Sequence, residues 1–397
     1  MSKELLESRW DEAKEALLEG LAGTRRSTMS VVLENTRKHL LSESAAAGST
    51  VSGNIATLNR VILPVIRRVM PTVIANELVG VQPMTGPVGQ IHTLRVRYGT
   101  TMQDNSAAAT STVAGEEALS PFKIAQAYSA GVGGVQNSYQ GASTASLEGV
   151  GGRNISVQLL KQAVEAKTRR LQARWTFEAA QDAQAMHGID IEAEIMAALA
   201  QEITAEIDQE ILLSLRSLAA TEFNFDQAAV SGTATFVGDE HAALAVLINR
   251  VANLIAQRTR RGAGNWAVVS PTALTVLQSA TTSAFARTTE GTFEAPTNTK
   301  FVGTLNSAMK VYVDSYATDS TPVLVGYKGS SEADAAAFYC PYIPLMSSGV
   351  VLDPSTFEPV VSFMTRYGYL ELTNTASSFG NAGDYVGAIS LSNLSFS

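Results

Sequence analysis

Length, composition and charge already narrow the class of protein. The chain has 397 residues, of which 45% are hydrophobic, so it is long enough for roughly two or three compact lobes with a buried core. Its net charge of −8 is uneven, with −1 over residues 1–43, +3 over residues 44–190 and −10 over the remainder. The charge pattern excludes a strongly basic nucleic-acid binder, and the absence of a long apolar run excludes a membrane span. We also expect no secretory signal, because the N-terminus is acidic, and no disulfide framework, because only one cysteine is present.

The first 43 residues predict a separate N-terminal piece. Fifteen of them are charged, and the apolar residues recur at helical spacing, which is typical of an amphipathic helix. Ser42–Asn54 follows and is small, polar and Gly-containing, as expected of a flexible linker. The apolar positions of the predicted helix are Leu5, Leu6, Trp10, Ala13, Leu17, Leu18 and Leu21.

Two stretches after the linker lack the pattern of a core. Thr57–Gly80 is apolar but interrupted by Pro64 and Pro71, which predicts an arm too broken for one straight helix. Gly99–Gly152 is rich in Gly, Ala, Ser and Thr, and it is longer than an ordinary structureless loop inside a domain. We expect this second stretch to be disordered or to be completed by a partner.

Two long helices are predicted next, as a spine. Arg153–His187 contains no Gly or Pro and carries an apolar stripe, so we expect a helix of roughly 45 Å that is capped by Gly188. A second helix begins at Asp190 as N-cap, with acidic residues in its positive first turn. Its apolar positions recur in steps of four from Ile191 to Leu215.

Beyond residue 220 the pattern becomes mixed. Asp239–Arg261 predicts a helix that ends at Gly262, and Ser270 followed by Pro271 predicts the capped start of another helix. Apolar or alternating runs of β-branched and aromatic residues predict strands. These runs are Trp266–Val269, Lys310–Tyr316, Pro322–Tyr327, Ala336–Tyr342, Val360–Tyr367 and Tyr369–Thr373.

No constellation of catalytic residues emerges. Neither a phosphate-binding loop nor a nucleophile elbow occurs in the sequence. We expect Cys340 to be a plain buried thiol. The four histidines show no metal-binding spacing: His39, His92, His187 and His241. Four carboxylates lie on one face of the second predicted helix: Glu202, Glu206, Asp208 and Glu210. Because no histidine accompanies them, we interpret them as a solvated face rather than as a dimetal site. We therefore expect no catalytic residue, no cofactor and no metal.

An unusual string marks the end of the arm. Gly80–Gln90 has three glycines and two prolines in eleven residues, which predicts turns rather than regular structure. The residues that define it are Gly80, Gln82, Pro83, Gly86, Pro87, Gly89 and Gln90. It closely resembles the string that follows the N-terminal arm in major capsid proteins of T-even-like tailed bacteriophages.

Further strings resemble the same family, in the same order, over about residues 57–368. The first two look like the family's spine helix, and the others match later segments. The strings are Gln162–Lys167, Ala180–Asp182 with His187–Gly188, Asn265–Trp266 with Ser270–Pro271, Lys310–Asp314, Val325–Gly329, Phe338–Leu345, Asp353–Pro354 and Met364–Gly368.

The resemblance implies an α+β Hong Kong 97-type coat fold. By it, residues 1–43 form an N-terminal assembly segment, residues 44–80 the N-arm and residues 81–152 the extended loop region. Residues 153–219 and 346–397 form the peripheral domain with its spine helix, and residues 220–345 form the axial domain. The extended loop then gains its contacts from a neighbouring subunit, which gives a role to a stretch that cannot fill a core.

The family resemblance also implies maturation by a protease that cuts after Glu in a Leu/Ile-x-Glu pattern. That pattern occurs at Glu7, Glu19 and Glu43 and nowhere else in the chain. We expect cleavage between Glu43 and Ser44, at the start of the linker. The alternative is an N-terminal arm that stays uncleaved.

The function implied by the resemblance is that of a major capsid protein whose homo-hexamers tile an icosahedral head around double-stranded DNA, without sequence-specific binding. Expected partners are a pentameric vertex subunit, a portal, a scaffold, a maturation protease and decoration proteins. One alternative is that this chain is the related vertex subunit. Another, from a different class, is an oligomeric enzyme with a mobile lid at residues 99–152.

Overall fold

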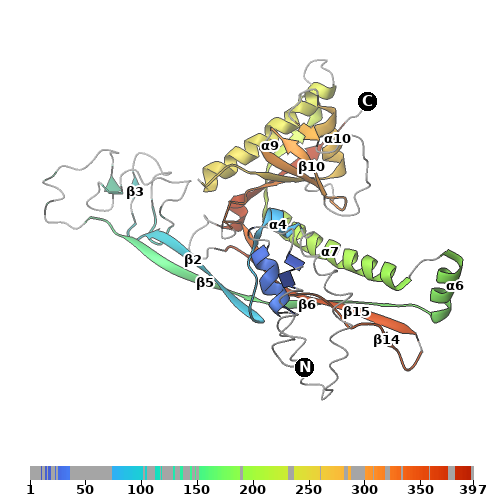
Figure 1. Ribbon diagram of the computed structural model, residues 1–397. Helices are drawn as coiled ribbons and strands as arrows, with labels where there is room; N and C mark the ends of the chain where they lie inside the picture. Colours follow the sequence, from blue (N-terminus) through green and yellow to red (C-terminus); the bar gives the residue numbers. More distant parts are fainter. Residues whose placement is uncertain are drawn as a thin grey trace. The chain divides into compact units, whose positions relative to one another are not determined.

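The structure is a computed structural model (Figure 1). It describes residues 10, 14–15, 17–18, 23, 26–35, 74–101, 103–104, 112–116, 118, 128–129, 135–136, 144, 148, 152–187, 191–230, 237–259, 261–280, 285–287, 300–306, 308–317, 322–331, 334–356, 358–373 and 381–394. Two compact units are present. The first comprises Met1–Gly89, Val164–Leu213 and Phe338–Leu370, and the second comprises Gln90–Ala163, Ser214–Ala337 and Glu371–Ser397.

A five-stranded sheet is the basis of the first unit. β1 (Gly80–Val81) runs parallel to β13 (Ala337–Ser347), and β13 and β14 (Val351–Leu352) both neighbour β15 (Pro359–Glu371). β6 (Lys167–Arg174) pairs with β15 in antiparallel register. Buried and half-buried residues alternate along most of β15, because successive strand residues point to opposite faces of a sheet.

The helices assigned to the first unit are α4 (Ala75–Leu78), α6 (Phe177–His187) and most of α7 (Ile191–Leu218). Ile203, Ile207 and Ile211 are buried on one face of α7. Near the N-terminus, the described residues among positions 1–43 are helical, as the amphipathic pattern predicted. The linker and residues 55–73 of the arm lie outside the described residues.

The second unit is built on a seven-stranded sheet in the order β7–β16–β12–β8–β11–β10–β9. Its strands are β7 (Ala220–Asp226), β8 (Trp266–Val269), β9 (Phe285–Arg287), β10 (Lys300–Leu305), β11 (Met309–Val313), β12 (Val323–Gly326) and β16 (Val386–Ser392). The pairs β7–β16 and β8–β11 are parallel, and the other described pairs are antiparallel.

Helices α9 (Val237–Thr259) and α10 (Pro271–Ser279) cover a face of this sheet, and their apolar side chains share one cluster with it. Ile248 of α9 and Val276 of α10 are fully buried there beside Val325 of β12. The cap at Ser270 is confirmed, since its side chain accepts a hydrogen bond of 3.2 Å from Ala273 N. Short α8 (Gln227–Val230) and the 3₁₀ turn η3 (Ala382–Tyr385) complete the helical elements described in this unit.

Two further strand pairs lie outside these sheets. β2 (Val88–Tyr98) and β5 (Ile155–Glu165) form a long two-stranded ribbon, and β3 (Gln103–Asp104) runs parallel to β4 (Val135–Gln136). Figure 1 shows β2 and β5 side by side along their length. Within the described residues, no helix is both long and apolar enough to cross a membrane.

The first predicted spine helix is wrong. Arg153–His187 forms β5, β6 and the short helix α6 instead of one helix of about 30 residues. The physical reason is pairing: β6 pairs with β15 from Lys167–Tyr367 to Arg174–Val360, and this tertiary contact overrides a helix-compatible spacing. The second predicted helix is confirmed as α7, of 28 residues, so a single long helix takes the place of the expected pair.

Two strands lie in units other than those expected from the domain boundaries. β13 was expected within an axial domain at 220–345, but it pairs with β1 and β15, and all but its first residue belongs to the first unit. β16 was expected in a peripheral domain at 346–397, but it lies between β7 and β12 in the second unit. Both placements depend on partners far away in the sequence, which local residue patterns do not reveal.

Candidate functional site

The string Gly80–Gln90 joins the five-stranded sheet to the ribbon. Its first two residues form β1 and pair with Phe338 and Tyr339 of β13. The N–H of Gln82 then donates to Tyr339 O at 3.0 Å, and that of Met84 donates to Pro341 O at 3.0 Å. Irregular structure was thus predicted correctly for the middle of the string and wrongly for its ends, where β1 and the first residues of β2 lie.

Close packing, rather than turn geometry alone, explains one glycine of the string. A Cβ at Gly89 would lie 3.1 Å from Val164 Cγ1 and 3.2 Å from Met84 Sδ. From β15, a Cβ at Gly368 would lie 2.5 Å from Cγ2 of the same valine. Three of the family-like strings, which are far apart in sequence, therefore meet at Val164, and two of them need a glycine to do so. The remaining string residues divide between exposed Gln82, Pro87 and Gln90 and half-buried Pro83 and Gly86.

A charged cluster ties helix α7 to the sheet of the first unit. Arg169 of β6 donates to Glu206 at 2.8 Å and to Glu210 at 2.7 Å, both on α7. Its Nε also donates to the hydroxyl of Tyr367 at 2.6 Å, and that hydroxyl donates to Glu210. The expectation of a solvated carboxylate face is therefore wrong for Asp208, which is fully buried and accepts a hydrogen bond of 2.9 Å from Ile74 N. Glu206 is exposed as expected, although it is ion-paired, and Glu210 is half-buried.

Glu210 is held in its charged form by this cluster. Partial burial alone would raise the pKa of its carboxyl group, but hydrogen bonds from Arg169 and Tyr367 and the nearby positive charge outweigh burial and lower the pKa below the usual value of 4.5. A carboxylate with a lowered pKa stabilises the folded state above its unfolded pKa, and this contribution is lost as the pH falls through the folded pKa.

We therefore expect Glu210→Gln to flatten the loss of stability on acidification. The wild type should lose stability as the pH falls below about 4.5, whereas the variant should be less stable at neutral pH and change less with acid. Urea unfolding at a series of pH values measures this. Glu202→Gln, on an exposed residue of the same helix, is the matched control, and equal acid slopes in wild type and Glu210→Gln would contradict the role of the cluster.

The ribbon formed by β2 and β5 carries apolar side chains into solvent. Gly99 N donates to Asn154 O at 2.8 Å at one end, and Ala166 N donates to Pro87 O at 2.9 Å at the other. One antiparallel register satisfies both bonds, and it places Leu94 opposite Leu159. The exposed apolar residues of this ribbon face are Leu94 (70%), Ile155 (52%), Val157 (64%) and Leu159 (66%).

Among the described residues, side chains of the chain itself bury one end of the face that carries these residues. Tyr98 lies on the same face of β2 as Leu94, four residues further along the strand. It is buried with Ala118 and Tyr128, and Val96 packs against them. The ring centroids of Tyr98 and Tyr128 are 4.6 Å apart, and the Tyr128 hydroxyl donates to Asn154 O at 2.6 Å. The apolar face of the ribbon is therefore buried at Tyr98 and exposed to solvent at Leu94 and Leu159.

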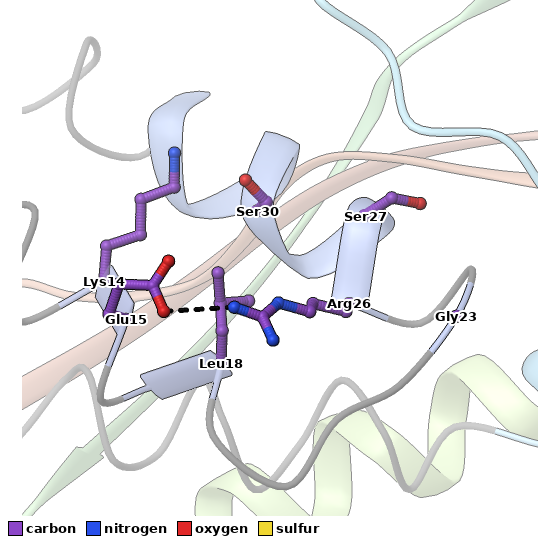
Figure 2. A pocket seen from close by; sticks show the side chains of 7 residues that line it. All are labelled: Lys14, Glu15, Leu18, Gly23, Arg26, Ser27 and Ser30. Atoms are coloured by element: carbon purple, nitrogen blue, oxygen red, sulfur yellow. Dashed lines mark hydrogen bonds and ion pairs between the residues drawn. The ribbon is translucent and has the colours of Figure 1, made fainter.

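A cavity of about 490 Å³ lies in the N-terminal segment (Figure 2). An ion pair of 3.0 Å between Arg26 and Glu15 spans it, and Lys14, Leu18, Gly23, Ser27 and Ser30 complete its lining. The lining includes neither histidine nor cysteine, and both members of the ion pair are exposed. The arrangement resembles no catalytic site.

The remaining candidate residues do not come together as a site. Among the described residues, no group of three or more His, Cys, Asp and Glu side chains could hold a metal ion. Cys340 is buried in β13, as expected of a plain buried thiol, and burial raises its pKa to about 12. Glu43 and Ser44, the expected cleavage position, lie outside the described residues, as do Glu7 and Glu19.

Sequence reasoning did not single out Arg169 or Asn35, and it noted Tyr367 only as part of the string Met364–Gly368. Each of the three binds residues that it did single out. Arginines, tyrosines and asparagines are common on any surface, and the partners lie far away in the chain. The sequence feature that could have indicated Arg169 is the cluster of carboxylates on α7, because clustered negative charges favour a cationic partner.

Comparison with known proteins decides the family. The model of the family described as Major capsid protein Gp23 matches residues 55–391 of this chain. The chain belongs to that family. It is a major capsid protein of the tailed-phage type and a structural component of the virion capsid. The expected mixture of helices and strands is confirmed by the structure.

Two phage proteins with similar sequences agree with this membership. A major capsid protein of Vibrio phage KVP40 is 31% identical, covering 84% of this chain and 81% of its own length. That of Enterobacteria phage T4 is 29% identical, covering 81% of this chain and 77% of its own. Among solved structures, the capsid of cyanophage P-SCSP1u is 10% identical with a TM-score of 0.45, over 81% of this chain and 89% of that one.

Proposed function

We propose that this capsid protein assembles into homo-hexamers through its exposed ribbon, and that these hexamers tile an icosahedral head. The observation that carries the proposal is the apolar face of β2–β5, on which Leu94, Val157 and Leu159 are each more than 60% exposed. An isolated two-stranded ribbon is marginally stable in water, and clustered exposed apolar residues mark interaction sites. A neighbouring copy of the chain supplies the missing cover.

A ring of subunits, as in the proposed hexamer, agrees with the symmetry of such a contact. The ribbon of one subunit and the surface that receives it are different patches, so the interface is heterologous and generates a ring when its rotation closes. The same contact with a different closure angle gives pentamers, which is the vertex role. The abundance of the chain in virions separates the two roles, because hexamers far outnumber vertices in a large icosahedral shell.

The domain roles are part of the same proposal. Residues 1–43 act as the assembly segment, residues 44–80 as the arm and the β2–β5 ribbon with its connecting stretch as the extended loop. The five-stranded sheet with α7 takes the peripheral role, and the seven-stranded sheet takes the axial role. Assembly occurs in the bacterial host cytoplasm.

The expected partners are a vertex subunit, a portal, a scaffold, a maturation protease and decoration proteins. Double-stranded DNA is enclosed without sequence-specific binding, which agrees with a net charge of −8 on the chain.

The direct test is negative-stain electron microscopy of the purified chain, together with sedimentation over a range of concentrations. We expect rings, tubes or closed shells in equilibrium with smaller species. A chain that stays monomeric at every concentration, with and without a scaffold, would contradict the proposal.

The fate of residues 1–43 is a separate prediction. Cleavage between Glu43 and Ser44 should leave a chain that begins at Ser44 in mature particles, because the cut lies at the start of a small, polar linker that a protease can reach. The intact mass of the protein from virions shows directly at which residue the mature chain begins. Glu43→Gln should keep the N-terminus in the particle, whereas Glu34→Gln, which leaves the cleavage pattern intact, is the control. A mass that begins at Met1 in mature virions would refute the cleavage.

A further inference from the structure

The bend in Gly80–Gln90 is also held from the N-terminal segment. Asn35 is the last described residue of the helical run Arg26–Asn35, and its side chain is buried. Its Nδ2 donates to Met84 O at 2.7 Å and to Tyr342 O at 3.1 Å. Met84 belongs to the bend and Tyr342 to β13, so one side chain connects three parts of the first unit.

A primary amide suits this position for a chemical reason. Its NH₂ group has two hydrogens, so it can serve two carbonyl oxygens at once, whereas a carboxylate of the same shape has none to donate. Backbone pairing between the bend and β13 ends nearby, with Met84 N donating to Pro341 O at 3.0 Å. Asn35 adds a connection beyond that last backbone bond, and a buried carbonyl without any donor is unfavourable.

The segment that presents Asn35 has a small core of its own. Leu18, Met29, Val32 and Leu33 are buried together, with Trp10 and Leu17 packed against them. Polar contacts within the segment add to this core. Lys14 lies 3.5 Å from Glu34. Arg26 lies 3.0 Å from Glu15 (Figure 2). Asn35 is therefore presented from a locally packed helix.

We infer that the carbonyl pair of Met84 and Tyr342 is a docking site for the chain's own N-terminal segment, and that Asn35 is the residue that recognises it. Docking braces the bend against β13 at the point where the chain leaves the sheet to enter β2. The assembly segment then acts on its own subunit, by fixing the bend that precedes the ribbon.

One consequence rests on the proposed function. If residues 1–43 are removed at Glu43, the brace leaves with them and both carbonyls lose this donor. The bend then keeps its backbone bonds to β13 and the bond from Ala166 N to Pro87 O but loses the bridge from Asn35, so it gains freedom only after cleavage.

Hydrogen exchange with mass spectrometry on the dilute, unassembled full-length chain tests the brace. The protected amides of Gln82 and Met84 report on the bend, and those of residues 337–347 report on β13. Asn35→Ala removes both donors, and exchange of Met84 should rise roughly tenfold. In Asn35→Asp, exchange of the Met84 amide should rise further, because a carboxylate then faces two carbonyl oxygens. Asn35→Gln keeps the side-chain amide, so its exchange rate at Met84 should be the closest to that of the wild type.

Ser30→Ala, on the same helix and facing the cavity of Figure 2, is the matched control and should leave exchange of the bend unchanged. Unchanged exchange of residues 80–90 in both Asn35→Ala and Asn35→Asp would overturn the inference. So would an equal rise across the seven-stranded sheet, since that reports a general loss of stability. If Asn35→Asp fails to fold, Asn35→Ala, which adds no charge, decides. Neither assembly nor cleavage enters this readout, so a failure of the proposed function leaves it standing.

Discussion

Replacing Arg216 by methionine is expected to lower the free energy of unfolding of the second unit by about 3–5 kcal/mol. Arg216 donates to Asp314 at 2.6 Å, and the side chains are 10% and 0% exposed, respectively. Asp314 also accepts from Tyr316 N at 3.0 Å, but a hydrogen bond from a neutral backbone group does not replace a buried cation beside a negative charge. Urea unfolding followed by the fluorescence of buried Trp266, in a background without Trp10 and Trp175, measures the change in this unit.

A matched control exists in the same unit. Arg261 also lies 2.6 Å from its partner, Asp334, but it is 56% exposed, so Arg261→Met should cost less than about 1 kcal/mol. The double variant Arg216→Met with Asp314→Leu should recover much of the loss, because no unpaired charge stays buried. If Arg216→Met and Arg261→Met cost the same, burial of the first pair does not matter and the explanation is wrong.

Placing a charge on the apolar face of the ribbon is expected to abolish assembly while the subunit stays folded. Leu159 is 66% exposed, so Leu159→Asp should change the free energy of unfolding by less than about 0.5 kcal/mol. In a contact between copies, however, the new carboxylate would be desolvated without a partner, which costs several kcal/mol per site. The yield of rings and shells, measured by sedimentation and microscopy, should fall at least roughly tenfold.

Gln158→Asp is the control for the ribbon. Gln158 precedes Leu159 on the same strand, is exposed and points to the opposite face. It should leave assembly close to wild type. Equal loss of assembly in both variants would mean that charge on β5 acts regardless of face, and unchanged assembly in both would remove the ribbon from the interface.

Several elements were predictable because their signals are local. The start of helix α10 could be predicted from Ser270 and Pro271, and strand β8 from a short run of apolar residues. Helix α7 likewise follows from apolar residues in steps of four. In each case the residues that determine the structure lie within a few positions of one another.

The stretch Arg153–His187 shows where local signals fail. Its residues suit a helix, but Ile155–Glu165 and Lys167–Arg174 form strands because β5 pairs with β2 and β6 pairs with β15. The placement of β13 and β16 failed for the same reason, since each strand joins a sheet through partners far along the chain. Propensity in a strand depends on its neighbours more than on the residue itself.

By itself, the sequence determined the family, the absence of an evident catalytic constellation, and the existence of helices α7, α9 and α10 and of strands β8, β11, β12, β13 and β15. It also marked Gly80–Gln90 as unusual, through its glycines and prolines. Only the tertiary structure decided why that string matters: it lies between β1 and β2, packs at Val164 and is bridged to β13 by Asn35. Composition reports what a segment can do alone, whereas hydrogen bonds and close packing between distant segments depend on geometry that no local pattern contains.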